Sequence, residues 1–209
     1  MTENIKQISQ FGQDIEVLNF YKNKKNGFFV EIGASDGKRF SNTYLLEKSF
    51  NWEGICSEPI PSIFKRLCKN RPNSKCSDYA VYNESNKEVI FDIASSCSLF
   101  SGISNHITTY KKRVDSNKVQ IKVKTITLND LLEKYNAPSF IDYLSIDTEG
   151  TEYEILQNVD FEKYTFGLID VENNNEENKR SLIKEILIKN GYIYLKELGC
   201  DDLYKHKSI

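Results

Sequence analysis

The chain has 209 residues, of which 39% are hydrophobic and 12% aromatic. This length and composition predict one globular domain over residues 1–209 and exclude a disordered chain. The 28 basic and 30 acidic residues alternate along the sequence and give a net charge of −2. We therefore expect no nucleic-acid partner, because nucleic-acid binders carry a clustered basic surface.

Short apolar segments alternate with helical patterns along the chain. This alternation is typical of βαβ units that form a mostly parallel sheet, so the predicted fold class is α/β. The expected strands are Phe28 to Ile32, Gly54 to Glu58, Ser77 to Val81, Ile141 to Asp147, Phe166 to Glu172 and Tyr192 to Leu195.

The helices between these strands have recognisable ends. Pro61 fits the first position of a helix that stops before Pro72. Thr127, with Asp130 three residues later, predicts an N-terminal cap for a second helix. A third helix is expected to end at Gly191. Its apolar face would consist of Leu182, Ile183, Ile186 and Leu187. We also expect residues 1–26 to form an N-terminal helical segment packed on the domain.

Two segments, Glu88 to Ile93 and Val119 to Lys124, alternate apolar and polar residues. Such alternation is typical of half-exposed antiparallel strands, so an inserted strand pair is expected to interrupt the βαβ series. Between them, Ser95 to Ser116 is polar and has no periodicity, which predicts a lid, a binding loop or disorder. His106 in this loop is either a mobile base that closes over a substrate or a surface histidine.

Membrane and disulfide features are not apparent. No segment reaches the roughly 18 to 20 apolar residues that span a bilayer, and Met1 to Gln10 lacks the apolar core of a signal peptide. The five cysteines include no C-x-x-C pair, so neither a disulfide framework nor a thiolate zinc site is expected. We expect a cytoplasmic protein without a membrane span.

Acidic residues follow four of the predicted strands. Ligands of open α/β sheets bind beyond the carboxyl ends of the strands, so these acids are candidate site residues. Their charge suggests a cationic or hydroxyl-rich ligand. They are Asp36, Glu58, the pair Asp147 and Glu149, and the pair Asp170 and Glu172.

The turn after the first strand points to an adenosine ligand. Gly33 allows a ligand to approach the backbone, and Glu58 follows 25 positions later, near the roughly 20-residue offset of a ribose-binding carboxylate. The turn lacks the G-x-G-x-x-G that binds a pyrophosphate, which disfavours NAD, FAD and ATP. S-adenosylmethionine, a nucleoside with a positive sulfonium, fits acidic walls. Alternatively, Gly33 and Gly37 only shape a tight turn.

The same turn also matches G-x-S-x-G, the nucleophile elbow of α/β hydrolases, with Ser35 as the nucleophile. Its context argues against that interpretation. The elbow needs earlier strands, whereas this turn follows the first one, and the late histidine could only be His206 near the C-terminus.

Several motifs in order resemble the FkbM-type S-adenosylmethionine-dependent methyltransferases. These are S-Q-F-G-Q-D at 9–14, F-V-E-I-G-A-S-D-G at 29–37, S-N-T at 41–43, L-E at 46–47, E-P at 58–59, N-R at 70–71, and D-Y-L-S-I-D-T-E-G at 142–150 with Glu152. The resemblance implies a Rossmann-like class I methyltransferase sheet of seven strands with helices on both faces. The last strand, near Asp202 to Lys207, would be antiparallel.

The resemblance also implies the residues that bind the cofactor. Those lining its methionine part would be Glu31, Gly33 and Asp36. Glu58 would bind the ribose diol, and Asp78 or the backbone near Ala80 would contact the adenine. Gln13 and Asn42 would reach the amino-acid end, although Gln13 could instead cap a helix.

Methyl transfer to an alcohol needs a group that removes the proton of the acceptor. The carboxylates of Asp147, Glu149 and Glu172 lie at neighbouring strand ends and are the catalytic candidates. Alternatively, they could together hold Mg²⁺ or Mn²⁺, because hard cations take oxygen ligands. The acids at 149 and 152 could alternatively complement the dipole of the next helix.

The resulting prediction is O-methylation of a sugar or glycan hydroxyl with S-adenosylmethionine, since many members of the family act on sugar or polyketide hydroxyls. The expected partners are a small-molecule or glycan acceptor and other glycosylation enzymes or domains. The alternative is a catalytically inactive module that binds the cofactor or acts as a scaffold within a glycan-building enzyme.

Overall fold

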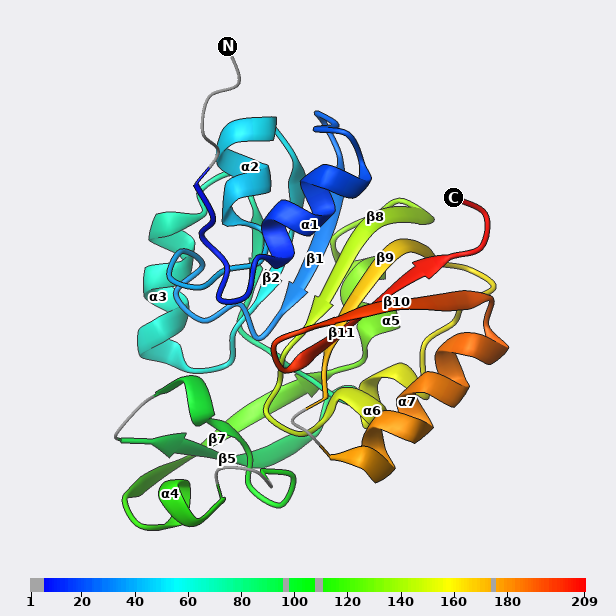
Figure 1. Cartoon of the computed structure of the whole chain (residues 1–209). Helices are drawn as coiled ribbons and strands as arrows, with labels where there is room; N and C mark the ends of the chain where they lie inside the picture. The colour runs from blue at the N-terminus through cyan, green and yellow to red at the C-terminus, as the bar shows by residue number, and fades with distance from the viewer. Residues whose placement is uncertain (1–5, 96–97, 108–110, 174–175) are drawn as a thin grey trace.

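The structure of the chain is a computed structural model that describes residues 6–95, 98–107, 111–173 and 176–209. It contains a seven-stranded sheet with helices on both faces and a second, four-stranded sheet beyond one end of the first (Figure 1). Cys97, one of the five cysteines, lies outside the described residues, and the other four are free thiols.

The strands of the large sheet have the order β10-β11-β9-β8-β1-β2-β3. Its parallel part consists of β1 (Phe28–Ile32), β2 (Glu53–Ser57), β3 (Lys75–Ser77), β8 (Phe140–Ile146) and β9 (Thr165–Glu172). The last strand, β11 (Asp201–His206), runs antiparallel to both neighbours, β9 and β10 (Tyr192–Leu198). The predicted mostly parallel sheet of seven strands with an antiparallel last strand is confirmed.

Two helical layers cover this sheet. One layer consists of α1 (Gln13–Phe20), α2 (Tyr44–Phe50) and α3 (Pro61–Asn70). The other consists of α5 (Leu128–Lys134), α6 (Glu152–Leu156) and α7 (Glu177–Lys189). Alternate residues of β1 face the two layers: Phe29 packs in the core of the first and Val30 in the core of the second. The parallel strands are thus buried on both faces, as their continuous apolar sequences predict.

The predicted helix ends agree with the structure, but one predicted helix face does not. Helix α3 begins at Pro61, and the Thr127 hydroxyl accepts a hydrogen bond from the Asp130 amide at 3.1 Å. In α7, Ile183 and Leu187 are buried, whereas Leu182 is 43% exposed. Successive helical residues point about 100° apart, so the face that buries Ile183 turns Leu182 to solvent.

The prediction of one strand from Ser77 to Val81 is wrong. Its first part belongs to β3 in the large sheet, and its second part is β4 (Ala80–Val81), which pairs with β7 (Lys118–Ile126) of the small sheet. The chain therefore crosses from one sheet to the other at residues 78–79.

The small sheet has the order β4-β7-β5-β6, with β5 at Glu88–Ala94 and β6 at Gly102–Ile103. Strands β5 and β7 pair antiparallel from Glu88 opposite Lys124 to Ala94 opposite Lys118, which confirms the inserted strand pair. The segment between them is not only a loop. It contains η1 (Ser98–Phe100), β6 and α4 (Lys111–Asp115), which are too short to give a sequence period. We call residues 88–126 the insert.

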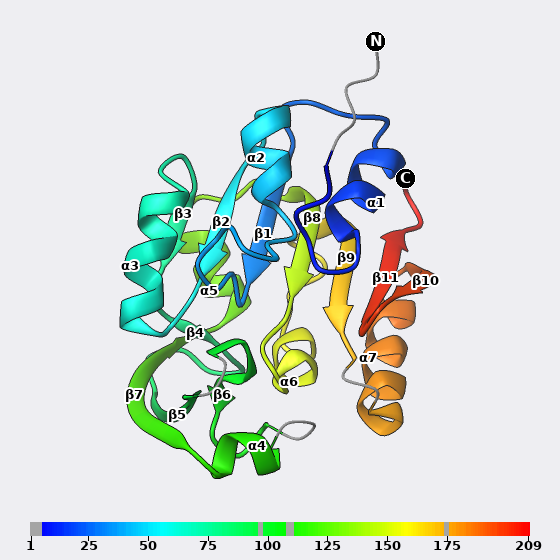
Figure 2. The ribbon, with the colours of Figure 1, turned by 60° about the vertical axis from the view of Figure 1, so that its left-hand side comes forward.

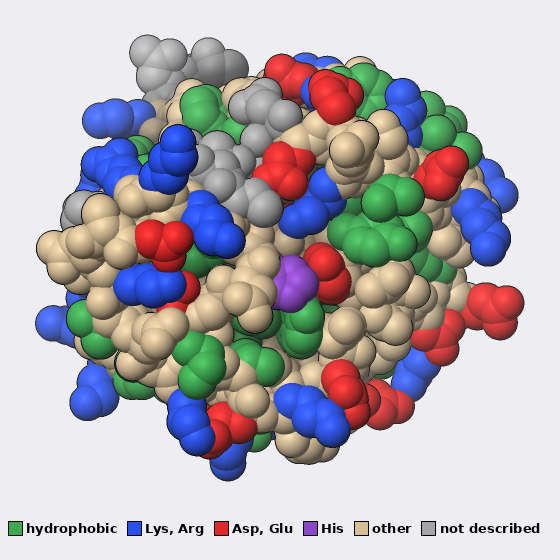
Figure 3. Space-filling model, turned by 90° about the horizontal axis from the view of Figure 1, so that it is seen from below, with side chains coloured by type: hydrophobic (Ala, Val, Ile, Leu, Met, Phe, Trp, Pro, Cys, Tyr) green, Lys and Arg blue, Asp and Glu red, His purple; other side chains and the backbone are tan. Residues whose placement is uncertain are grey.

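Figure 2 shows the arrowheads of β1, β2, β8 and β9 pointing toward the insert. The insert therefore lies beyond the carboxyl ends of these parallel strands. Seen from this end, basic and acidic side chains are interspersed over the visible surface (Figure 3). Within the described residues, no helix has the length and apolar character needed to cross a membrane; the longest, α7, has 13 residues.

Residues 6–26 contribute α1 to the first helical layer. Helix α1 buries Val17 and Leu18, and Ser9 forms a bridge with Phe40 in the segment between β1 and α2. The N-terminal segment is therefore held at the same end of β1 as the acidic turn that follows this strand.

A buried arginine connects the elements around β1. Arg71 follows α3 and is fully buried. Its Nε donates to Glu47 at 2.5 Å, its Nη1 to Glu31 at 3.4 Å and its Nη2 to the Thr43 hydroxyl at 2.9 Å. Because Glu31 lies on β1 and Glu47 on α2, one guanidinium joins the strand, both helices and the loop between them.

We expect Arg71→Met to lower the free energy of unfolding by about 3 to 5 kcal/mol, because it leaves the buried Glu31 carboxylate without its cation and Glu47 with Lys48 alone. Urea unfolding of the variant and of Lys65→Met, an exposed position on the same helix, would measure this. The control should change stability by no more than about 0.5 kcal/mol. Equal effects of the two substitutions would contradict the role given to Arg71.

Candidate active site

A cavity lies at the carboxyl ends of the parallel strands, between the large sheet, the N-terminal segment and the insert. Parallel strand ends meet at one edge of a sheet, which is why side chains far apart in sequence converge there. Eight of the ten predicted site residues line this cavity: Gln13, Glu31, Gly33, Asn42, Glu58, Asp147, Glu149 and Glu172.

The structure does not bring Asp36 and Asp78 to the cavity. The Asp36 carboxylate accepts hydrogen bonds from the backbone amides of Lys38 at 3.1 Å and Arg39 at 2.9 Å, so it caps the turn that contains it. Asp78 is exposed where the chain crosses between the sheets. Its neighbour Ala80 lines the cavity, in agreement with the alternative of a backbone contact near that residue.

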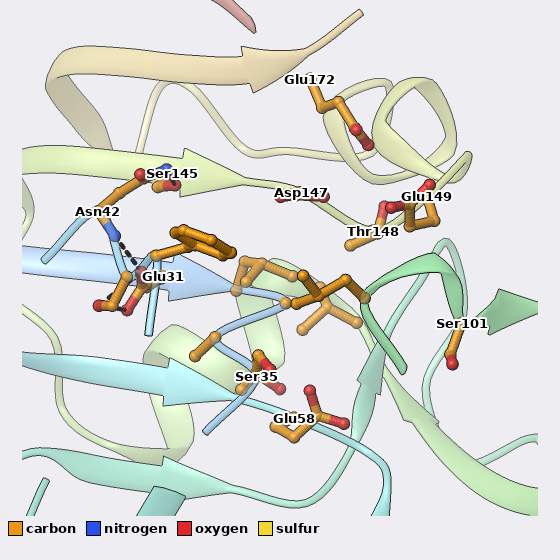
Figure 4. A pocket seen from close by; sticks show the side chains of 18 of the residues that line it. Glu31, Ser35, Asn42, Glu58, Ser101, Ser145, Asp147, Thr148, Glu149 and Glu172 are labelled. Atoms are coloured by element: carbon orange, nitrogen blue, oxygen red, sulfur yellow. Dashed lines mark hydrogen bonds between the residues drawn. The ribbon is translucent and has the colours of Figure 1, made fainter. Parts of the chain in front are cut away.

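Glu31 projects from β1 and, besides Arg71, is held by three donors of the segment that precedes α2. Its carboxylate accepts hydrogen bonds from the Asn42 amide at 2.7 Å, the Thr43 hydroxyl at 2.7 Å and the Ser41 hydroxyl at 3.0 Å. The Asn42 side chain donates in turn to the Ser145 hydroxyl on β8 at 3.0 Å (Figure 4). Glu31 and Asn42 are therefore fixed in place on the same side of the cavity.

Gln13 has contacts at both ends of its amide. Its Nε2 donates to Asp201 at 2.5 Å, and its Oε1 accepts from the Phe11 amide at 2.9 Å. The second contact lies before α1, and the start of this helix has no side-chain cap hydrogen bond, so Gln13 does not cap it. Gln13 forms part of the cavity wall.

The glycines of the first turn are required by the protein itself. Gly33 has a φ of +81°, and a Cβ there would overlap the backbone carbonyl of Asp147. Gly37 has a φ of +71°, and a Cβ there would overlap the side chain of Leu67. The tight-turn interpretation therefore holds for both glycines, although Gly33 also lines the cavity.

Glu58 lies across the cavity from Asp147, at the end of β2 (Figure 4). Its carboxylate accepts a hydrogen bond from the Ile60 amide at 2.8 Å. Burial raises the pKa of Glu58 to about 7, while backbone amides of Ile60 and Ser35 limit the shift. The carboxylate is thus held with one oxygen committed to the backbone.

The three predicted catalytic acids come together. One carboxylate oxygen each from Asp147, Glu149 and Glu172 lies within 4.8 Å of the others, and Figure 4 shows Glu172 pointing toward the turn that carries the other two. Strands β8 and β9 are neighbours, so their ends place Asp147 beside Glu172. We call these three residues the acid cluster.

The acid cluster is electrostatically unfavourable without a cation or bound protons. Asp147 is accessible from the cavity, yet protein surrounds it, and desolvation together with the Asp201 carboxylate raises its pKa to about 7. Desolvation and the charge of Asp147 raise the pKa of Glu172 well above its usual range. Among the described residues, Glu172 Oε2 is buried without a hydrogen-bond partner.

The turn that carries Glu149 is held from two sides. Glu152, in the first turn of α6, accepts hydrogen bonds from the amides of Thr148 at 2.9 Å and Gly150 at 3.1 Å. On the other side, a Cβ at Gly150 would overlap the His106 carbonyl of the insert. Glu149 itself has a φ of +60°, which is uncommon for a residue other than glycine.

Neither histidine lies on the cavity. His106 contacts the Tyr82 hydroxyl at 2.9 Å and the Glu154 carboxylate at 3.3 Å, so it bridges the insert and α6 and is not placed as a mobile base. His206 lies at the far end of β11 from Asp201 and contacts Ser208 at 2.7 Å. Ser35 therefore has no nearby histidine among the described residues, and the hydrolase interpretation is wrong.

The sequence reasoning missed several residues that line the cavity. Asp201 could have been found, because an antiparallel strand starts at the edge where parallel strands end. The insert contributes an apolar wall that carries no motif. It consists of Phe91, Leu99, Phe100 and Ile103.

Comparison with known families gives one extensive match. The model of the family described as Methyltransferase FkbM domain matches residues 31–194. A curated protein, anthranilate synthase component 1 of Buchnera aphidicola subsp. Rhopalosiphum padi, is 29% identical over 87 residues, which are 42% of this chain and 17% of that protein. A match to so small a part of the enzyme carries no activity over to this chain.

A solved structure of a methyltransferase shares the fold. The methyltransferase FkbM from Methylobacillus flagellatus KT superimposes with a TM-score of 0.53 at 14% identity, over 88% of this chain and 44% of that one. The precorrin-6y C5,15-methyltransferase from Geobacter metallireducens GS-15 gives 0.49 at 11% identity, over 91% and 84%. The chain thus spans less than half of the first of these proteins.

The raised pKa values predict an unusual pH dependence of stability. Folded Asp147 and Glu58 have pKa values of about 7, against 3.8 and 4.5 as ordinary values. Protonation of these two carboxyl groups in the folded protein makes its full contribution to stability at pH values below the ordinary pKa values. This contribution is lost as the pH rises through about 7. The ligand-free protein should therefore melt at a higher temperature at about pH 6 than at about pH 8.

Asp147→Asn should raise the melting temperature at about pH 8 and reduce the difference between the two pH values. Thermal unfolding followed by circular dichroism would measure both effects. Asp78→Asn, at an exposed position away from the cavity, is the matched control. A variant at 147 that keeps the full pH dependence would show that this carboxyl does not titrate as expected.

Proposed function

Because the chain belongs to the family of FkbM methyltransferases, we propose that it transfers the methyl group of S-adenosylmethionine to a hydroxyl group of a sugar or glycan. S-adenosylmethionine is the methyl donor of methyltransferases with this fold. The observation that carries the choice of a hydroxyl acceptor is the acid cluster, which faces the cavity with carboxylates whose pKa is raised.

The proposed cofactor position uses the residues of the strand ends. Glu58 would accept hydrogen bonds from the ribose diol, and Ala80 would contact the adenine through its backbone. Glu31 and Asn42 would lie beside the methionine part, at the end of the cavity that also holds Gln13. In this position the positive sulfonium is close to carboxylates, which favours the charged donor over its neutral product.

Methyl transfer is an in-line displacement. The carbon–sulfur bond of the sulfonium breaks as the acceptor oxygen forms a bond to the methyl carbon, and the acceptor loses its proton. We assign Asp147 as the base that takes this proton, with a pKa of about 7 that suits a general base at neutral pH. The remaining contribution of the protein is to align donor and acceptor.

A divalent cation held by the same three carboxylates is the alternative to proton removal by Asp147. The acid cluster offers three carboxylate oxygens within 4.8 Å of one another, and buried Glu172 Oε2 has no partner among the described residues. This donor set fits Mg²⁺ or Mn²⁺, which prefer oxygen ligands. Such an ion would lower the pKa of an acceptor hydroxyl. Asp147, Glu149 and Glu172 would hold it.

The acceptor is proposed to lie between the acid cluster and the apolar wall of the insert. A sugar ring presents both hydroxyls and apolar C–H faces, so it fits a cavity whose wall combines carboxylates with the apolar side chains of Phe91, Phe100 and Ile103. Other glycosylation enzymes or domains remain the proposed partners.

The first test is calorimetric titration with S-adenosylhomocysteine, with NADH as the control ligand and with either Mg²⁺ or EDTA present. We expect saturable binding of S-adenosylhomocysteine alone, because the first turn lacks the glycines that bind a pyrophosphate. No binding by the folded protein would contradict the proposed function. Binding without methyl transfer to any hydroxyl acceptor would favour the inactive-module alternative.

A second test concerns Glu58. We expect Glu58→Ala to weaken S-adenosylhomocysteine binding by about 1 to 3 kcal/mol, since it removes a charged hydrogen-bond acceptor. Glu58→Gln keeps an acceptor for the Ile60 amide. A loss of affinity in this variant would therefore report the ribose contact and not a change in the local structure. In the unmodified protein, affinity should fall as the pH drops below about 7, and the glutamine variant should lose this dependence. Unchanged affinity in both variants would place the ribose elsewhere.

A further inference from the structure

Most of the charged side chains that line the cavity are acidic. Six carboxylates line it, from Glu31, Glu58, Asp147, Glu149, Glu172 and Asp201. Among the described residues, Arg39 is the one cationic side chain on the wall. S-adenosylmethionine carries two positive groups, the sulfonium and the ammonium, and one negative group, the carboxylate. Carboxylate walls suit the first two and repel the third.

Arg39 is placed at the amino-acid end of the proposed cofactor position. It lies in the segment between β1 and α2, next to Phe40, which forms the bridge with Ser9 of the N-terminal segment. Its guanidinium lies 4.7 Å from the centre of the Phe40 ring. Among the described residues, no carboxylate pairs with this guanidinium, whereas Arg71 and Arg180 both have carboxylate partners.

The two side-chain amides assigned to this end are uncharged, and each already donates one hydrogen bond within the protein. Gln13 Nε2 donates to Asp201 at 2.5 Å, and Asn42 Nδ2 donates to Ser145 at 3.0 Å. The backbone amide of Asn42 donates to Glu31 at 2.7 Å. The sequence-based assignment of Gln13 and Asn42 therefore leaves the cofactor carboxylate without a positively charged partner. A guanidinium provides one with a geometry that matches a carboxylate.

We propose that Arg39 binds the carboxylate of the amino-acid part of the cofactor. This inference rests on the proposed function and deepens it, because it names the group that orients the methionine end. The contact fixes the cofactor with its carboxylate toward the N-terminal segment and its sulfonium toward the acid cluster.

The test uses two ligands that differ only in the carboxylate: S-adenosylhomocysteine and its decarboxylated form, S-adenosyl-3-thiopropylamine. Calorimetric titration of Arg39→Met should show S-adenosylhomocysteine binding weakened about 10-fold or more, because a charge-assisted hydrogen bond is lost. Binding of the decarboxylated ligand should weaken less than about two-fold. Arg39→Lys, which keeps the charge but not the planar guanidinium, should give an intermediate loss.

Lys38→Met is the matched control, since Lys38 is adjacent in sequence and does not line the cavity. It should leave the affinity of both ligands unchanged. Equal losses for both ligands in Arg39→Met, or no loss for either, would overturn the inference. Failure of the unmodified protein to bind S-adenosylhomocysteine would instead contradict the proposed function, and the inference would fall with it.

Discussion

The buried guanidinium of Arg71 is the interaction on which the rest of the site depends. It takes up the charge of Glu31 and Glu47 in the interior of the first helical layer, where an unpaired carboxylate would be costly. Glu31 in turn receives the Asn42 amide, and Asn42 reaches across to Ser145 on β8. The two buried ion pairs of Arg71 therefore set the position of the loop that forms the methionine side of the cavity.

On the opposite side of the cavity, like-charged carboxylates lie close together. Asp147, Glu149 and Glu172 are brought together by neighbouring strand ends and by a turn that Glu152 holds. Burial and the charge of Asp201 raise the pKa of Asp147, and burial and the charges of Asp147 and Glu149 raise the pKa of Glu172. The ligand-free fold therefore carries an unfavourable interaction that a proton or a cation would relieve. On the side of Glu31, the protein itself neutralises the carboxylates. On the side of the acid cluster, a ligand would have to neutralise them.

Much of this arrangement follows from the sequence. Buried apolar runs identify the parallel strands, and the rule that ligands lie beyond their carboxyl ends brings the acids of three strands to one cavity. The rule cannot tell which way a side chain turns at a crossover, so Asp78 was misplaced. The elements of the insert are too short to give a period. Arg39 lacked a signal because its proposed role depends on contacts between segments distant in sequence, whereas the start of the antiparallel last strand could have indicated Asp201.

The packing of Gly33 against Asp147 and of Gly37 against Leu67 has a consequence for how relatives are recognised. Both glycines are demanded by the interior of the protein whether or not a nucleoside ever binds. A descendant that had lost the reaction would still be under selection to keep them. The glycine turn is therefore a marker of ancestry and folding, and evidence of an active enzyme must be sought in the carboxylates of the other strand ends.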